Sequence, residues 1–314
     1  MDTEHTEKTI GFVGLGRMGQ AMCARLVEAG YRVHATDVDS AARDAAAQHG
    51  VCVYEDVAGL IAQLPSPATV WLMVPSQYVE TVLTEIVAHL PEGGTIIDGG
   101  NSPYQDSQRR YHELKDRGID WLDCGTSGGI EGARHGASLM VGGEIEVFAA
   151  HEHLFNTLAV PDGYARVGGP GAGHFVKAVH NGIEYGMMGA LAEGLALLDE
   201  YQSQFDLSVE QVLRPYEHGS IITSRLMSWL AEGYREGLPE QIAGEVPMGE
   251  TETKMEHLTT LGTMPILQAA IQQRRTTRET PSRAGAYLST MRNKFGGHAM
   301  IPSVDENNQE SDRP

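Results

Sequence analysis

The sequence predicts an α/β protein in which a doubly wound parallel sheet is followed by an all-helical domain. Three observations lead to this fold class. In the first half, short apolar runs alternate with segments of helical periodicity, as in a parallel sheet covered by helices. A glycine-rich turn joins the first apolar run to the first helical segment. After about residue 168 the strand patterns disappear and only helical periodicity remains.

The expected elements of the first half follow in chain order. Apolar runs at 70–74 and 95–97 have no polar face, which is typical of parallel strands buried on both sides. Six strands are expected in all, at residues 10–13, 32–36, 70–74, 95–97, 120–122 and 138–141. Helices are expected between them, at residues 16–29, 41–49, 77–89 and 106–117.

The second half predicts helices throughout. Apolar residues repeat at helical spacing from 171 to 200, which indicates one helix roughly 45 Å long. This stripe consists of Phe175, Val179, Ile183, Met187, Leu191, Leu195 and Leu198. Further helical segments are expected within 209–234 and 255–291. Residues 302–314 are polar and acidic, so we expect disorder there.

The charge balance of the chain is strongly acidic. Asp plus Glu is 42 against 23 Lys plus Arg, which gives a net charge of −19. This balance disfavours nucleic acid and anionic lipid as partners. An acidic, lysine-poor surface suits a high-salt cytosol, and it equally suits an ordinary acidic enzyme. In either case, any basic cluster in this chain is a candidate anion site.

Cysteine usage and hydropathy indicate a cytoplasmic protein. Cys23, Cys52 and Cys124 are scattered, which predicts neither a disulfide framework nor a metal site. No run of eighteen apolar residues occurs, and the polar N-terminus does not resemble a signal peptide.

A GxGxxG pattern follows the first expected strand and opens the first helix, which is the context of a Rossmann-type dinucleotide site. Gly14 allows a tight turn, Gly16 lets the backbone approach a pyrophosphate, and Gly19 lets helix and strand pack closely. Arg17 and Met18 lie between these glycines. Val74, which ends a later expected strand, and Asn101, which follows another, complete the predicted cofactor contacts.

Asp37 predicts a preference for NAD over NADP. It ends the second strand about twenty residues after the glycines, where an acid hydrogen-bonds the adenosine ribose. A 2′-phosphate would meet Asp37 and Asp39, and the nearest cation is Arg43. The alternative interpretation is that Asp37 only caps the next helix.

Three further segments carry groups suited to catalysis. DGGNS (98–102) ends a parallel strand, where such sheets bind ligands, and GTSGG (125–129) is expected as a small-residue loop. On the long helix, Lys177 shares one face with His180, Asn181 and Glu184. Lys177 and Glu184 are roughly 10 Å apart along the axis, a span that brackets a short carbon chain. A solvated polar stripe is the alternative.

These segments resemble one enzyme family. FVKAVHNGIEYG (175–186), EGARHGASLM (131–140) and RNKFGGH (292–298), with GTSGG and DGGNS, resemble 6-phosphogluconate dehydrogenases. The resemblance covers most of residues 10–298, and the length is similar to the family's shorter branch. GxGxxG and GTSGG also occur in related β-hydroxyacid dehydrogenases, whereas HNGIEY and RNKFGGH are more specific.

The resemblance implies a role for each matching residue. Lys177 would be the base that takes the proton of the substrate 3-hydroxyl, and Glu184 the acid that protonates C1 after CO2 is lost. Arg292 and His298 would reach the site from a partner subunit, which implies at least a dimer. The residues implied to hold the sugar acid or its phosphate are Asn101, Ser127, Gly128, Gly129, His180, Asn181 and Tyr185.

The chain departs from the family pattern in one segment. The family motif Gly-x-Gly-Lys/Arg-Trp-Thr aligns with residues 249–254, where Glu252 replaces the expected cation and the tryptophan is absent. Lys254 is a candidate replacement for the phosphate, or the pocket accepts a different aldonate. A phosphate-binding arginine is expected after Pro265. Arg274 fits best, and Arg275 and Arg278 remain alternatives.

The sequence therefore predicts a dinucleotide-binding domain (1–170), a helical substrate and dimerisation domain (171–301) and a tail (302–314). The expected activity is NAD-dependent oxidative decarboxylation of 6-phosphogluconate. Two rivals remain. A β-hydroxyacid dehydrogenase without decarboxylation would keep Lys177 but would not need Glu184. A non-catalytic NAD-binding sensor would need only the glycine motif.

Overall fold

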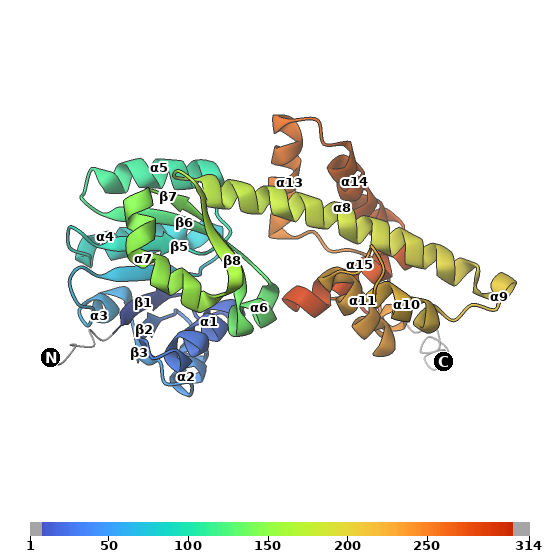
Figure 1. The fold of residues 1–314 in the computed structure, drawn as a ribbon, viewed down its shortest axis with the longest axis horizontal. Helices are drawn as coiled ribbons and strands as arrows, with labels where there is room; N and C mark the ends of the chain where they lie inside the picture. The colour runs from blue at the N-terminus through green and yellow to red at the C-terminus, as the bar shows by residue number, and fades with distance from the viewer. Residues whose placement is uncertain (1–7, 304–314) are drawn as a thin grey trace, which may run out of the picture. The chain divides into compact units, whose positions relative to one another are not determined.

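The structure, a computed structural model, describes residues 8–303 and divides into two compact units, 1–177 and 178–314 (Figure 1). Unit 1 is built on one sheet. Its strands are β1 (Thr9–Val13), β2 (Arg32–Thr36), β3 (Cys52–Tyr54), β4 (Thr69–Leu72), β5 (Thr95–Asp98), β6 (Asp120–Ser127), β7 (Ala137–Gly143) and β8 (Ala159–Gly168). Its helices are α1 (Arg17–Glu28), α2 (Ser40–Ala47), α3 (Val57–Ile61), the short 3-10 helix η1 (Ser76–Tyr78), α4 (Val79–His89), α5 (Tyr104–Lys115), α6 (Gly129–His135) and α7 (Ile145–Leu158).

The eight strands lie in the order β3-β2-β1-β4-β5-β6-β7-β8. Strands β1 to β6 pair in parallel, β7 is antiparallel to β6, and β8 is parallel to β7. The strand order reverses between β1 and β4. In a doubly wound sheet, ligands bind outside the carboxyl ends of the strands at such a reversal. The predicted α/β fold class is confirmed.

Helices cover both faces of this sheet (Figure 1). Phe12 and Val13 are neighbours on β1 but belong to different apolar clusters, because successive strand side chains point to opposite faces. One cluster joins the sheet to α1, α6 and α7, and the other joins it to α3, α4 and α5. The buried sheet holds the strand ends, and therefore the loops that follow them, in fixed positions.

Unit 2 is helical. The long helix α8 (Ala172–Glu200) begins in unit 1 and continues into unit 2. The remaining helices are α9 (Gln202–Phe205), α10 (Val209–Glu217), α11 (Arg225–Arg235), α12 (Leu238–Gln241), α13 (Glu250–Leu261), α14 (Pro265–Glu279) and α15 (Arg283–Gly296). One apolar cluster joins α8 to α10, α11 and α15, and a second joins it to α13 and α14.

Several elements differ from the prediction. Strands β3 and β8 and helices α3, α6 and α7 were not expected. Strand β8 was hidden by its exposure and its Pro161-Asp162-Gly163 turn signal, both typical of an edge position. The expected loop at GTSGG is wrong, because β6 stays paired with β7 as far as Ser127 and α6 begins at Gly129.

The expected apolar stripe of α8 is also wrong in part. Phe175, Ile183 and Met187 are 39%, 60% and 43% exposed, and the buried face carries Tyr185, Met188, Ala192 and Leu195. A row of residues spaced by four drifts about 40° around an α-helix at each step. The predicted row therefore starts on the exposed side and reaches the buried side only near Leu195.

The domain limits were expected near residues 170 and 302. The two units divide instead after Lys177, inside α8. The expected disorder is wrong for Pro302 and Ser303, because Pro302 forms a β-bridge with Ile242 and the Ser303 N–H donates to the Gln241 carbonyl at 2.9 Å. The rest of the expected tail, 304–314, lies outside the described residues.

Candidate active site

The glycine-rich turn between β1 and α1 has the geometry that a dinucleotide requires. Gly14 adopts φ 101°, and a Cβ there would lie 2.5 Å from the Met73 carbonyl oxygen and 2.9 Å from the Val74 side chain. A Cβ on Gly19 would lie 2.1 Å from the Gly14 carbonyl oxygen, whereas at Gly16 it would meet nothing within 4 Å. The backbone at Gly16, the N-cap of α1, is therefore open to a phosphate. The residues present fit a dinucleotide.

Asp37 is tied to this turn. Its Oδ2 accepts the Leu15 N–H at 2.6 Å, and its Oδ1 accepts the Asp39 N–H at 2.9 Å. Asp39 caps α2, so the interpretation of Asp37 as a helix cap is wrong. Arg43 donates to the Asp37 carbonyl oxygen at 2.6 Å. The end of β2 therefore presents the carboxylates of Asp37 and Asp39 and one guanidinium.

The DGGNS segment follows β5, as predicted, and it is held by a buried carboxylate. Asp98 is fully buried, and it accepts the Ser102 hydroxyl at 2.6 Å and the Gly100 N–H at 3.1 Å. These bonds close the loop around Asn101. Asn101 is half-buried at the carboxyl edge of the sheet, the edge where Gly14 follows β1.

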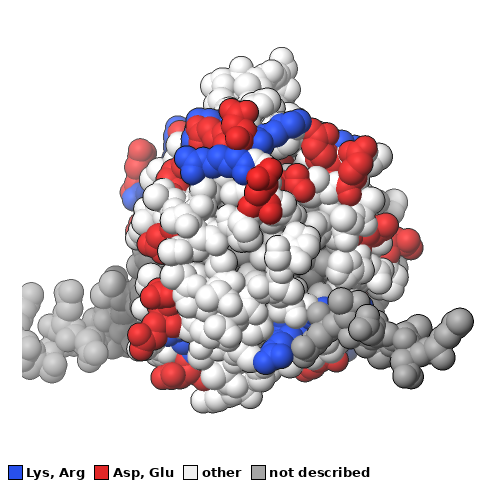
Figure 2. Space-filling model, turned by 90° about the vertical axis from the view of Figure 1, so that its left-hand side faces the viewer, with Lys and Arg blue, Asp and Glu red and all other residues white. Residues whose placement is uncertain are grey.

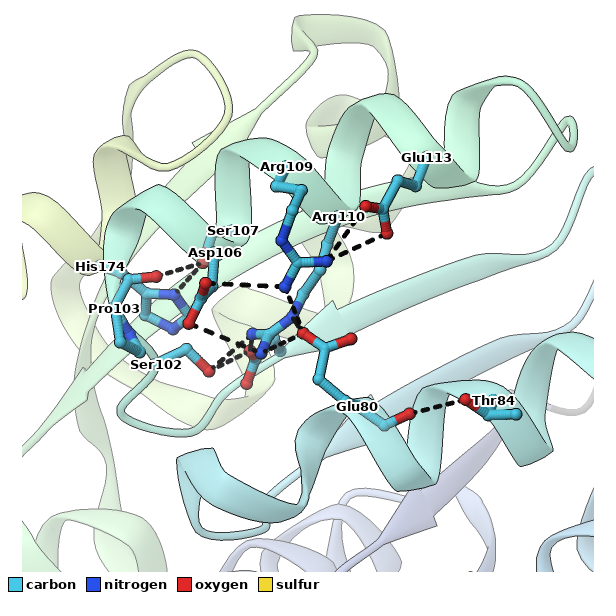
Figure 3. A network of polar contacts seen from close by, with 11 residues as sticks. Glu80, Thr84, Ser102, Pro103, Asp106, Ser107, Arg109, Arg110, Glu113 and His174 are labelled. Carbon is cyan, nitrogen blue, oxygen red and sulfur yellow. Dashed lines mark hydrogen bonds and ion pairs between the residues drawn. The ribbon is translucent and has the colours of Figure 1, made fainter.

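A network on α5 supports the same loop (Figure 3). Arg110 is 2% exposed, and its guanidinium contacts Asp98 at 3.3 Å, Ser102 at 3.1 Å and Glu80 at 3.0 Å. Burial opposes ionisation of Glu80, but Arg109 and Arg110 hold the pKa of its carboxyl below the usual value. This buried guanidinium is fully matched by carboxylates of its own unit.

The N-terminus of α8 is fixed to β6 by a second buried carboxylate. Asp123 is fully buried and accepts the Gly171 N–H at 2.7 Å and the His174 N–H at 2.9 Å. His174 shares a hydrogen bond of 2.7 Å with Ser107 on α5 (Figure 3). A Cβ on Gly125 would lie 2.4 Å from the Lys177 Cβ, so the stem of Lys177 packs directly on β6.

The helix predicted to carry the catalytic groups is confirmed as one continuous element. His180 lies on it near Glu184, with 3.8 Å between Nδ1 and the carboxylate, and its Nδ1 is 3.3 Å from the Asn181 side-chain oxygen. Glu184 is 24% exposed and follows Lys177 by two helical turns. The helix geometry supports the predicted shared face.

Unit 2 contains a cluster of buried arginines. Arg274 on α14 is 4% exposed, and its guanidinium carbon lies 3.5 Å from the centre of the Tyr185 ring. Arg292 on α15 is 7% exposed and donates to the Pro247 carbonyl at 2.9 Å. Neither guanidinium has a carboxylate partner within the described part of the chain, and Arg274 Nε has no hydrogen-bond partner there. Burial lowers the pKa of both groups.

Glu252 joins this cluster from α13. Its side chain is 3% exposed and accepts two bonds from Arg278, at 2.7 and 2.9 Å, with Arg275 at 3.5 Å. Burial opposes its ionisation, but Arg278 and Arg275 hold the pKa of the Glu252 carboxyl below its usual value. Lys254 lies about 200° around α13 from Glu252, on a different side of the helix from the residue that pairs with Arg278.

The C-terminal motif divides between two places. Within its own chain Arg292 belongs to the arginine cluster of unit 2, and its role at the site of a partner subunit stays a prediction. The ring of His298 is exposed and contacts Phe295 with 5.8 Å between ring centres.

Sequence reasoning missed Asp123, Arg110 and the pairing of Glu252 with Arg278. Asp123 lies inside β6 between the apolar residues Leu122 and Cys124, and a lone acid among apolar strand residues is the signal that could have identified it. The partners of Arg110 and Glu252 come from elements distant in sequence, so no local signal identifies them.

On the face that Figure 2 shows, Lys and Arg are interspersed with Asp and Glu near the top of the view, and the middle is largely uncharged. The described residues on this face form no broad basic area. Within residues 8–303, no helix combines the length and apolar character needed to cross a membrane. The same residues contain no group of three or more His, Cys, Asp or Glu side chains suited to a metal ion.

Comparison with known proteins identifies the family. Residues 9–168 match the NAD-binding domain of 6-phosphogluconate dehydrogenase, and residues 173–203 match its C-terminal domain. The chain is 40% identical over 293 residues to YqeC of Bacillus subtilis, a protein named as a candidate 6-phosphogluconate dehydrogenase. That match covers 92% of this chain and 98% of the Bacillus protein. This chain belongs to the 6-phosphogluconate dehydrogenase family.

Other members extend the comparison. The NAD(+)-dependent, decarboxylating 6-phosphogluconate dehydrogenase of Haloferax volcanii is 35% identical over 304 residues, which cover 94% of this chain and 99% of that protein. The Plasmodium falciparum 6-phosphogluconate dehydrogenase, whose structures contain NADP+ or the substrate, superposes with a TM-score of 0.77 and 25% identity. That match covers 95% of this chain and 67% of the Plasmodium chain. A 3-hydroxyisobutyrate dehydrogenase of Mycobacterium tuberculosis shares the fold, with a TM-score of 0.71, 22% identity, and coverage of 91% and 100%.

Proposed function

We propose that this member of the family oxidises and decarboxylates 6-phosphogluconate to ribulose 5-phosphate and CO2, with NAD as the hydride acceptor. One observation carries the proposal. Helix α8 places Lys177 against β6, Glu184 two turns later, and then Tyr185, whose ring packs on the buried Arg274. The proposed proton acceptor, proton donor and anion-binding group thus follow one another along a single helix. The name of the Haloferax relative supports both the reaction and the cofactor.

The proposed mechanism assigns two proton transfers. Lys177 takes the proton of the substrate 3-hydroxyl while the C3 hydride leaves. NAD, when bound, accepts that hydride. The 3-keto acid then loses CO2, and protonated Lys177 stabilises the negative oxygen of the enediolate. Glu184 donates a proton to the carbon that carried the lost carboxylate, which is C2 of the substrate and C1 of the product, and this step completes ribulose 5-phosphate.

The remaining residues would bind and orient. Gly14, Gly16, Gly19 and the first turn of α1 would hold the cofactor pyrophosphate, and Asp37 the adenosine ribose. Tyr185, Arg274 and Arg292 would hold the phosphate. The residues left for the sugar acid are Asn101, Ser127, Gly128, Gly129, His180 and Asn181.

The test is NAD reduction by the full chain with 6-phosphogluconate, while released CO2 is trapped. Lys177→Met removes the base of the first step and should abolish NAD reduction, a loss of at least about a hundredfold. Glu184→Gln should slow turnover by a similar factor through the last protonation. Turnover and CO2 release within twofold of wild type in Glu184→Gln would show that Glu184 is not the acid.

Cofactor choice follows from the end of β2. The carboxylates of Asp37 and Asp39 should repel a 2′-phosphate, so kcat/KM should be higher with NAD than with NADP. Arg43 is the group that works against this preference. Asp37→Asn should reduce the difference in kcat/KM between NAD and NADP, since it removes one of the two negative charges. A wild-type kcat/KM with NAD that is equal to or below that with NADP contradicts the preference for NAD.

Glu252 favours a second candidate, an aldonate other than 6-phosphogluconate, because it stands where the family motif has a cation. On that view gluconate should serve about as well as 6-phosphogluconate. The proposal predicts instead that gluconate has a KM at least about tenfold higher, because it lacks the charge-assisted bonds to Arg274 and Arg292.

We also propose at least a dimer. Ile183 and Met187 on α8 and Ile266 on α14 are 60%, 43% and 71% exposed, and Ile266 lies against Gly186. Adjacent exposed apolar side chains of this size are typical of a subunit interface. Sedimentation of the full chain tests this assignment.

A further inference from the structure

Glu252 is a buried carboxylate in a place built for anions. The arginines around it would each attract a ligand anion, and an internal carboxylate competes with that ligand for them. A carboxylate among these arginines weakens the binding of a ligand anion. Its presence is explained if Glu252 sets the net positive charge that the arginine cluster offers to the ligand. The charges of the cluster therefore have to be counted.

Three buried or half-buried guanidinium groups face one carboxylate. Arg278 forms a two-point bond with Glu252, so these two charges cancel. Arg274 and Arg292 have no carboxylate partner among the described residues and keep their charges. The net charge of the cluster is therefore plus two.

Two neighbouring groups do not change this count. Arg275 is 45% exposed and contacts Glu252 at 3.5 Å, but it also pairs with Glu256, which is 38% exposed, so its charge is matched at the surface. The Glu184 carboxylate acts on the Arg274 charge through space and raises the Arg274 pKa, but it forms its ion pair with His180 rather than with either buried arginine, so it is not counted in the cluster.

A second observation indicates that the two remaining charges await a ligand. Arg274 Nε is a buried donor without a partner in the described structure, and the Arg274 face is covered by the ring of Tyr185. Leaving such a donor unpaired is costly, because its hydration is lost and nothing replaces it. Arg292 lies against Gly249, the N-cap of α13, where a Cβ would approach its Nη2 to 3.2 Å. An anion there would meet a guanidinium and the positive end of a helix.

We propose that Glu252 is a specificity-determining residue that sets the charge of this anion site. By neutralising Arg278 it leaves plus two, which matches one dianionic group such as a phosphate monoester. The inference rests on the proposed function for its natural ligand. It goes further in assigning the selectivity to a residue that does not touch the ligand's phosphate.

The test measures binding of sulfate, which carries two charges, and pyrophosphate, which carries about three near neutral pH, to the full chain by calorimetry. In Glu252→Gln the site becomes plus three, so the preference for pyrophosphate over sulfate should rise at least about tenfold. In Arg278→Gln it becomes plus one, and the preference should fall. The double variant Glu252→Gln with Arg278→Gln restores plus two and should return within about threefold of wild type.

Glu256→Gln is the matched control, because Glu256 lies one turn along α13 and also pairs with Arg275, but at the surface. The preference of Glu256→Gln for pyrophosphate over sulfate should stay within about threefold of wild type. The rival explanation is that Glu252 is only a favourable acid in the first turn of α13. In that case Glu252→Gln lowers the melting temperature and leaves the preference for pyrophosphate over sulfate unchanged. Adding Arg278→Gln then does not restore the melting temperature.

The proposal is overturned if folded Glu252→Gln has the same preference for pyrophosphate over sulfate as the wild type. It is also overturned if the double variant differs from the wild type as much as Glu252→Gln does, or if the wild type binds neither anion. If Glu252→Gln does not fold, the comparison of Arg278→Gln with the double variant carries the same prediction. The outcome is separate from the proposed reaction. Charge-dependent binding without turnover of 6-phosphogluconate refutes only the reaction, and turnover with an unchanged ratio refutes only the role of Glu252.

Discussion

Two buried arginines, Arg110 in unit 1 and Arg274 in unit 2, are 2% and 4% exposed, yet their surroundings differ completely. Arg110 meets the Asp98 carboxylate. It also meets the carboxylate of Glu80 and the hydroxyl of Ser102 (Figure 3). Arg274 meets an aromatic ring and a methionine sulfur, and its Nε has no partner in the described structure.

The difference teaches how to separate a structural charge from a functional one. A buried charge is tolerated only when an opposite charge or hydrogen bonds compensate for its lost hydration. Unit 1 supplies the compensation itself, so Arg110 holds the DGGNS loop in place. Unit 2 supplies no such compensation to Arg274 within the described residues, so a bound anion would have to supply it. Burial alone does not distinguish the two cases, whereas the partners do.

The largest expected effect is on stability in unit 1. Arg110→Met leaves Asp98 buried without its cation, so the free energy of unfolding should fall by about 3–5 kcal/mol. Chemical denaturation measures it. The control is Arg109→Met, one residue earlier, which removes exposed pairs with Glu80 and Glu113 and should cost at most about 1 kcal/mol. Equal losses in the two variants would mean that Arg110 is not the structural charge described above.

Arg274→Met should behave in the opposite way. Removing an uncompensated buried charge should change the free energy of unfolding by less than about 1.5 kcal/mol in the absence of anions. Sulfate should raise the melting temperature of the wild type and should no longer do so in the variant. A large loss of stability together with an undiminished sulfate effect would show that Arg274, like Arg110, is structural.

The smallest effect concerns pH. Arg109 and Arg110 hold the pKa of Glu80 below its unfolded value against the effect of burial, so its contribution is present above the unfolded pKa of about 4.5. That contribution is lost as the pH falls through the lowered folded value. Glu80 is 53% exposed, so solvent screening limits it to about 0.5 kcal/mol. The difference in stability between wild type and Glu80→Gln should therefore shrink below pH 4.5. A difference that does not change with pH contradicts the role of its charge.

The strands that lie in the middle of the sheet could be predicted, because they are apolar on both faces. The β1 and β4 segments are examples, and the glycine turn after β1 identified the cofactor region. The edge strand β8 could not be predicted, because its exposed residues carry no apolar pattern and its turn signal suggests a loop. The buried face of α8 was placed wrongly because both of its sides are apolar, and spacing alone does not choose between them.

The sequence by itself determined the fold class, the dinucleotide motif and the family, since each depends on residues close together in the chain. It also determined that Lys177 and Glu184 share a helix. Only the tertiary structure decided which arginines have partners, because Asp98, Glu80 and Arg110 come from three elements, and so do Tyr185, Glu252 and Arg274. Charge compensation depends on distance in space, and the chain order does not record it.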